Sequence, residues 1–265
     1  MNNIIRYGSI FYAMLLRDLL VLRSKIVSLL IDSSVVLVNE ILILGLLYPQ
    51  IGMSVEYIAP LFIGSSVVFI LIDLGYSFAM RYTYNVPYTG YAEIQYHLLL
   101  PLPKWFVFAE YIVYFVIESL VVSVPLLLIG VFVMPSIRVM VIGSWALFWV
   151  FYVMSVFFFG IFFMASSFWY TPEWFKDNMW PRRLNMLLCF SSVFYPWYQV
   201  DALMPWLAKL LLLNPLTYVT EGMRAALLGD AQYVSLSICV PVLIGFILFD
   251  CWRLKRGVYN SLDPV

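Results

Sequence analysis

Five carboxylates lie within apolar stretches of the sequence, where a charged side chain is costly: Asp32, Glu40, Asp73, Glu110 and Glu118. A charged group at the centre of a bilayer costs about 3 kcal/mol on insertion scales, so most of these groups must face protein or water. No lysine or arginine lies at mid-span to pair with them. Glu40, Asp73 and Glu118 could therefore contact a substrate or carry protons, or they could be protonated or hydrogen-bonded inside a helix bundle. We favour the structural interpretation.

The other residue types that support chemistry are sparse. His97 is the only histidine, and we expect it to be a contact residue rather than a metal ligand. Cys189, Cys239 and Cys251 form no CxxC pair, so the sequence predicts neither a zinc site nor a disulfide framework. HExxH, GxSxG and G-x-x-x-x-G-K-[ST] motifs are all missing from the sequence. We therefore predict no catalytic site, no metal site and no cofactor site in this chain.

The composition indicates the elements that must hold these residues. Of the 265 residues, 64% are hydrophobic and 11% are charged, and the mean hydropathy is +0.94. A soluble domain is about half apolar and about a quarter charged, so this chain has too little polar surface to face water on all sides. The 18% aromatic content excludes intrinsic disorder, and the net charge of zero disfavours nucleic-acid binding. The chain is predicted to be a polytopic membrane protein in contact with lipid.

We predict an all-α integral membrane protein in which residues 1–265 form a single transmembrane domain. A spanning helix needs about 20 mostly apolar residues. Apolar side chains at helical spacing, with charges among them, predict an interfacial amphipathic helix over residues 4–25. The six predicted spans are about 26–48, 57–80, 105–134, 138–168, 184–200 and 233–252.

Positive charges predict the orientation. If both termini lie inside, most of the 15 lysines and arginines fall on the inner side. Only Arg138, Lys209 and Arg224 then lie outside. Because positive charge marks the cytoplasmic side, both termini are predicted to be cytoplasmic.

The inner loop 81–104 contains a segment that we expect to contact other protein surface. Its middle, 90–100, can form about three helical turns that Pro101 and Pro103 end. Leu98 and Leu99 would be costly in water, so this short helix should dock. It could dock on a partner or on the ends of the protein's own spans, and the residues alone leave both alternatives open.

The outer segment 201–230 predicts a re-entrant helical hairpin between spans five and six. Asn214 can cap a helix that begins at Pro215, and Gly229 can end it. Glu221 and Arg224 are three residues apart and can pair. The preceding stretch 204–213 is apolar but too short to cross a bilayer.

These two loops resemble a known family. The stretch 214–229, NPLTYVTEGMRAALLG, is similar to the NPLTxxxExxRxxLLG stretch of type-2 ATP-binding-cassette (ABC) transporter permeases. Residues 191–196, SSVFYP, and 203–206, LMPW, resemble the family's S-x-x-F-x-P and LP-x-W. In the inner loop, GYAE at 90–93 and LLLP at 98–101 resemble the GTxE…LLxxP coupling segment.

The resemblance implies a homodimer in the bacterial inner membrane that exports a drug, glycolipid or polysaccharide. Two cytosolic ATPase subunits would supply ATP and Mg, and this chain would hydrolyse nothing. The implied ATPase contacts are made by the coupling segment: Gly90, Glu93, His97, Leu98, Leu99 and Pro101. The implied outer motif consists of Asn214, Pro215, Glu221, Arg224 and Gly229.

Two alternatives stay open. A proton-coupled secondary transporter would use the buried carboxylates, but it would need interrupted spans in both halves, and the one clear interruption lies in the C-terminal half. A membrane scaffold is the third class. An ATPase reading frame beside this one would favour the exporter. The aromatic run 157–163 could line a transport route or face lipid.

Overall fold

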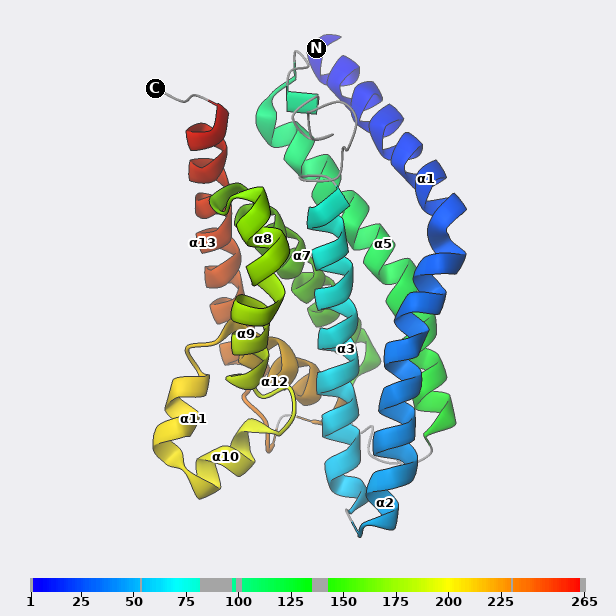
Figure 1. The fold of residues 1–265 in the computed structure, drawn as a ribbon, viewed down its shortest axis with the longest axis vertical. Helices are drawn as coiled ribbons and strands as arrows, with labels where there is room; N and C mark the ends of the chain where they lie inside the picture. Colours follow the sequence, from blue (N-terminus) through cyan, green and yellow to red (C-terminus); the bar gives the residue numbers. More distant parts are fainter. Residues whose placement is uncertain are drawn as a thin grey trace.

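The computed structural model describes residues 2–52, 54–81, 97–98, 102–134, 143–229 and 231–262. The regular elements in these ranges are all helices (Figure 1). Five helical segments are long and apolar enough to cross a membrane: Tyr7–Gln50, Tyr57–Ala79, Lys104–Val133, Trp145–Trp169 and Leu236–Tyr259. The predicted all-helical class is confirmed, and the several long apolar helices fit a membrane protein.

The N-terminal helix is longer than predicted. Helix α1 (Asn2–Glu40) continues through the π-helix η1 (Ile41–Leu47) into α2 (Tyr48–Gln50). The structure therefore has one continuous helical element where an interfacial helix and a separate first span were expected. No glycine or proline occurs between Ser9 and Leu44, so nothing ends the helix near residue 25. Most of this element is exposed, and only 11% of its most apolar window is buried.

Helix α7 (Trp145–Trp169) is the centre of the bundle. It packs against α3 (Val55–Ala79), α5 (Lys104–Val133), α12 (Pro215–Leu228) and α13 (Leu236–Leu262). Of the aromatic run, Phe158, Phe159, Phe162 and Phe163 are buried in the core. These rings stabilise the bundle by removing apolar area from solvent or lipid and by close packing.

The predicted fifth span, 184–200, is not a continuous helix. Three short elements follow one another from 172 to 189, namely α8 (Pro172–Asn178), η3 (Met179–Leu184) and α9 (Asn185–Cys189). The chain then turns over 190–196 before α10 (Trp197–Leu203) and α11 (Pro205–Leu211). Serines and prolines near the turn interrupt the helix, and the acidic and basic residues of α8 and η3 make 172–189 too polar to qualify as an apolar span. The sixth span stays a prediction.

The outer segment contains three short helices rather than a simple pair of half-helices. Helix α10 is half-buried except at its C-terminal end, α11 is mostly exposed, and Leu203 and Leu213, which follow or end these helices, are 82% and 74% exposed. Every residue of α12 from 216 to 228 is buried. At its C-terminal end, the Gly143 and Ser144 N–H groups each donate to an α12 carbonyl at 2.9 Å. Helix α12 is thus an internal helix whose end is closed by hydrogen bonds.

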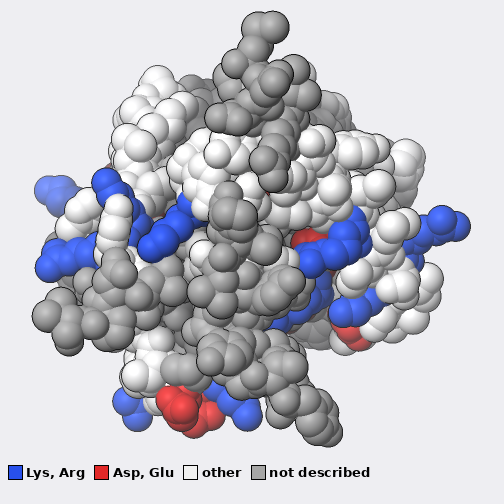
Figure 2. Space-filling view, turned by 90° about the horizontal axis from the view of Figure 1, so that it is seen from above, with Lys and Arg blue, Asp and Glu red and all other residues white. Residues whose placement is uncertain are grey.

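Both chain termini lie at one end of the bundle (Figure 1). Figure 2 looks onto that end and shows several groups of Lys and Arg side chains, with fewer Asp and Glu. This arrangement agrees with the expectation that the two termini share a side. We refer to it below as the terminal end.

Candidate functional site

Glu221 and Arg224 form a buried ion pair within α12. Arg224 Nη1 lies 2.7 Å from Glu221 Oε1, and both side chains are fully buried. The predicted pairing is confirmed. Because a buried charge is costly unless it is paired and hydrogen-bonded, the remaining bonds of both groups decide whether the pair stabilises the fold.

The Arg224 guanidinium also binds backbone carbonyls of two other segments. Its Nε donates to Pro60 O in α3 at 2.8 Å. In the turn 190–196, Nη1 donates to Ser192 O at 2.6 Å and Nη2 donates to Val193 O at 3.0 Å. A Cβ built on Gly64 would lie 2.2 Å from Arg224 Nη2, so glycine at this position lets the guanidinium approach α3. Arg224 therefore joins α12, α3 and the turn.

The Glu221 carboxylate binds two backbone N–H groups that have no helical partner. Oε1 accepts from Trp197 N at 3.0 Å, at the first residue of α10. Oε2 accepts from Val234 N at 3.5 Å, just before α13. Unpaired N–H groups at a helix start carry partial positive charge, which suits a carboxylate. The ion pair therefore fixes the segments on both sides of α12.

The ends of α12 match the predicted signals. Asn214 Oδ1 accepts from Leu216 N at 3.0 Å, so Asn214 is the N-cap. Its Nδ2 group donates to Leu187 O at 2.7 Å and to Phe190 O at 2.6 Å, near the end of α9. Gly229 follows the helix with a φ of 102°, in the region that favours glycine. The Asn214 cap and the Gly229 stop are both confirmed.

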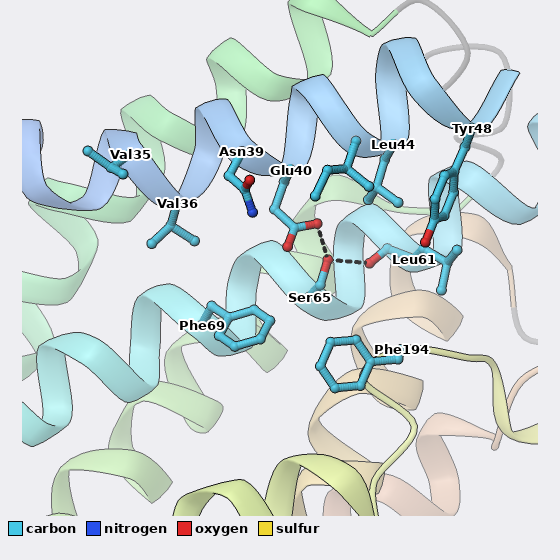
Figure 3. A pocket seen from close by; sticks show the side chains of 11 residues that line it. Val35, Val36, Asn39, Glu40, Leu44, Tyr48, Leu61, Ser65, Phe69 and Phe194 are labelled. Carbon is cyan, nitrogen blue, oxygen red and sulfur yellow. Dashed lines mark hydrogen bonds between the residues drawn. The ribbon is translucent and has the colours of Figure 1, made fainter. Parts of the chain in front are cut away.

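A cavity of about 550 Å³ lies between the α1–η1 element and α3 (Figure 3). Its walls are mainly apolar, and Phe69 from α3 and Phe194 from the turn 190–196 face each other with ring centroids 5.9 Å apart. The polar lining residues are Asn39, Glu40, Tyr48 and Ser65. Apolar cavities of this size with a few polar groups are typical of ligand sites.

Glu40 is the acidic group of this cavity, and it is hydrogen-bonded. Its Oε2 lies 2.7 Å from Ser65 Oγ, and the same hydroxyl lies 2.8 Å from Leu61 O (Figure 3). The Ser65 hydroxyl is the donor, and its single proton is shared between the Glu40 carboxylate and the Leu61 carbonyl. A ligand with an apolar body could lie against the aromatic rings and donate a hydrogen bond to Glu40 or Asn39.

Glu118 has a basic partner, contrary to the expectation that no lysine or arginine reaches it. Arg81 Nη1 lies 3.1 Å from Glu118 Oε1 and donates to Tyr114 OH at 3.1 Å. Helix α5 extends beyond the end of α3 (Figure 1), so a residue directly after α3 is level with the middle of α5. The structural interpretation of Glu118 is supported by this network. Asp73 is half-buried on α3, Asp32 is exposed on α1 and Glu110 is buried in α5.

The predicted coupling segment is only partly described. Gly90, Glu93, Leu99 and Pro101 lie outside the described residues. His97 and Leu98 are buried, with 2% and 9% of their surface exposed. These two residues therefore pack on the protein's own helices, which was one of the two alternatives for this segment.

His97 connects two helices of the bundle. Its Nε2 lies 3.0 Å from Arg17 Nη1 in α1, and its Nδ1 is hydrogen-bonded to Tyr111 OH in α5. Arginine can only donate, so Nε2 is the acceptor and Nδ1 carries the proton. Burial, assisted by the Arg17 charge, lowers the pKa of His97 below its usual 6.5. Burial and the Arg17 contact thus favour the neutral form of the ring between α1 and α5.

Sequence reasoning missed three partners of the predicted charges: Ser65 of Glu40, Arg81 of Glu118, and the carbonyls that receive Arg224. Ser65 and Arg81 are distant in sequence from the acids they bind, so no local spacing indicates either contact. No group of three or more potential metal ligands occurs among the described residues.

Comparison with known proteins gave no match to a family model, to a curated protein or to a solved structure. The class that the fold itself defines is an all-helical protein with several helices long and apolar enough to cross a membrane.

Proposed function

We propose that this chain is the membrane-spanning permease subunit of an ATP-driven exporter of the type-2 ABC class. The observation that carries the proposal is the contact between α12 and the turn 190–196. The two stretches through which the sequence resembles these permeases, 191–196 and 214–229, contact each other through buried hydrogen bonds. The motif residues Glu221 and Arg224 bind the backbone of Ser192, Val193 and Trp197. If this chain shares the fold of these permeases, the residues of its two motifs should contact each other, as they do here.

The path of the chain supports six crossings, although five apolar helices qualify by composition. Trp169 Nε1 donates to Arg253 O at 2.7 Å, so the C-terminal ends of α7 and α13 lie together. The two helices therefore run in the same direction, and the chain must return across the bundle between them. Residues 172–203 make that return (Figure 1). We infer that α8, η3 and α9 replace the expected fifth span.

In the proposed exporter, the cavity beside Glu40 contributes to the route of a hydrophobic or lipid-linked substrate. A homodimer would bury further surface of α1 and α13, whose apolar windows are only 11% and 22% buried within one chain. Two ATPase subunits would bind at the terminal end. The chain itself would hydrolyse nothing.

A proton-coupled transporter is the competing function, and the structure gives its carboxylates less freedom than the sequence suggests. Glu118 is paired with Arg81. Glu40 lines an open cavity and Asp73 is half-buried on α3, so these two carboxylates remain the candidates for a proton-carrying group. The two functions differ in energy source, which can be measured directly.

The test is reconstitution of the full chain in proteoliposomes, with and without an ATPase subunit taken from a reading frame that lies beside this one. If the chain is an exporter subunit, it should form a stable complex with the ATPase, and ATP hydrolysis should depend on this chain. A P-loop Lys→Ala variant of the ATPase is the control that does not hydrolyse ATP. A proton ionophore should leave the activity unchanged. Flux driven by a pH gradient without ATP, and lost in Glu40→Gln, would instead establish the secondary transporter.

Topology is tested separately with single cysteines in a variant that lacks Cys189, Cys239 and Cys251. Labels at Asn3 and after Lys255 should react only when the inner face is opened. A label at Lys209 should react from outside, because it follows the proposed fifth crossing. Equal accessibility of positions 176 and 209 from the same side would refute six crossings.

A further inference from the structure

A second groove, of about 560 Å³, lies between α5 and α13 at the terminal end, away from the cavity beside Glu40. Both helices pack against α7, and the groove lies between them. Its floor is apolar and is formed by Phe108, Ala109, Ile112, Leu254 and Val258. The Phe108 ring packs edge-on against Phe168 of α7 at 5.7 Å, which closes the back of the groove.

The charges of this groove all have one sign. Lys104 and Lys255 line it, and no carboxylate is among its lining residues. Within the described part of the chain, neither ammonium group has a carboxylate in ion-pair distance. Lys104 lies 5.8 Å from the centre of the Tyr259 ring. Trp105 and Tyr259 also line the groove and are 68% and 55% exposed.

We propose that this groove binds one anionic phospholipid, with an acyl chain along the apolar floor and the phosphate between Lys104 and Lys255. The arrangement has the two parts that such a lipid requires: an apolar channel at the membrane-facing surface and two cations at its end. Long basic side chains beside apolar surface extend toward the headgroup region, and basic pockets between membrane helices bind anionic headgroups. Aromatic residues such as Trp105 and Tyr259 favour the same interface.

A second copy of the chain fits the groove less well. If the groove lay on the axis of a twofold interface, its two copies would meet, and four lysines would lie in one apolar contact without a counter-charge; a homodimer that buries other parts of α1 and α13 leaves the groove open. A free phosphate would use the lysines and leave the apolar floor uncovered. The lipid satisfies both, and its binding does not depend on the proposed transport function.

Cys251 lies in the groove and reports its occupancy. The experiment uses the full chain with Cys189→Ser and Cys239→Ser in mild detergent, so that Cys251 is the one thiol. The rate of its reaction with N-ethylmaleimide is measured while dioleoylphosphatidylglycerol or dioleoylphosphatidylcholine is titrated in. We expect the anionic lipid to slow labelling at lower concentration than the zwitterionic lipid. Inorganic phosphate and glycerol 3-phosphate should not slow it.

The matched variants separate this site from general attraction to the basic end. Each lysine removed should weaken phosphatidylglycerol protection about fivefold, so the double variant Lys104→Gln, Lys255→Gln should lose the preference. The double variant Arg182→Gln, Arg183→Gln removes two exposed charges of η3 outside the groove. It should retain the preference for phosphatidylglycerol over phosphatidylcholine. A chain with Cys189 as its one thiol should show no protection. Each variant is compared with itself, with and without lipid, after its folded state is checked by gel filtration.

Three results would overturn the proposal. Equal protection by both lipids would show that the lysines select no headgroup. If the arginine double variant lost the phosphatidylglycerol preference as much as the lysine double variant, or if Cys189 were protected as much as Cys251, the lipid would be attracted diffusely to the basic surface and not bound in the groove. Protection that increases with protein concentration in lipid-free detergent would assign the groove to a second copy.

Discussion

Arg224→Ala should destabilise the fold severely, and the size of the effect follows from the contacts that are lost. Removal of the guanidinium leaves the Glu221 carboxylate buried without its partner. Breaking a buried pair from one side costs about 3–5 kcal/mol. The carbonyls of Pro60, Ser192 and Val193 lose a donor as well, at about 1–3 kcal/mol for each one that stays dry. A loss of about 5 kcal/mol or more is therefore expected, against a total stability of about 5–15 kcal/mol.

The assay is thermal unfolding of the detergent-solubilised protein, followed by far-ultraviolet circular dichroism. At about 2–4 °C per kcal/mol for chains of roughly this size, Arg224→Ala should lower Tm by roughly 10–20 °C. Lys209→Ala is the matched control, because Lys209 is an exposed cation in the neighbouring helix α11. Exposed substitutions of this kind usually stay within about 0.5 kcal/mol.

A charge swap tests whether the carbonyls matter beyond the pair itself. With Glu221→Arg and Arg224→Glu together, the new carboxylate would face the carbonyls of Pro60, Ser192 and Val193, which repel it. We expect the swap to be no more stable than Arg224→Ala. Restored stability in the swap, or equal stability of Arg224→Ala and Lys209→Ala, would refute this account of the site.

The remaining predictions concern other contacts of the bundle. Gly64→Ala should destabilise the protein by several kcal/mol, since its Cβ would lie 2.9 Å from a carbonyl oxygen as well as against the guanidinium; Gly245→Ala, with nothing within 4 Å, should be neutral or slightly stabilising in the same melt. Arg81→Ala should cost about 3 kcal/mol by leaving Glu118 unpaired, and adding Glu118→Gln should recover part of the loss in a double-mutant cycle. Because the pKa of His97 is lowered in the folded state, its contribution to stability is present above about pH 6.5 and is lost as the pH falls below that value. His97→Gln should flatten the pH dependence of Tm in this window, and an unchanged slope would contradict the assignment.

The sequence was informative where a contact is local along the chain. The Asn214 cap spans two residues, the Glu221–Arg224 pair spans three, and Gly229 directly follows the helix it ends. All three contacts are in the structure because helical geometry brings such neighbours together regardless of the rest of the fold. The apolar runs likewise predict long helices by composition alone.

Contacts between distant segments were not predictable in the same way. Arg81 and Glu118 are 37 residues apart, and their meeting depends on how far α5 extends beyond α3. Residues 190–196 were predicted to lie inside the fifth span, because no local signal shows that Arg224 needs their carbonyls. The first helix was divided at residue 25 on the basis of charge, although no residue there ends a helix. Charge distribution predicts where a membrane boundary lies, whereas a helix ends where glycine, proline or a capping residue interrupts its backbone hydrogen bonds.

The turn 190–196 lies between the buried ion pair and the cavity beside Glu40, and it contacts both. Val193 O accepts from Arg224, and the next residue, Phe194, forms the cavity wall against Phe69. On the other side, Arg224 binds Pro60 in α3, the helix that also carries Ser65 and Phe69. The buried pair and the cavity are therefore neighbours that share helix α3 and the turn 190–196.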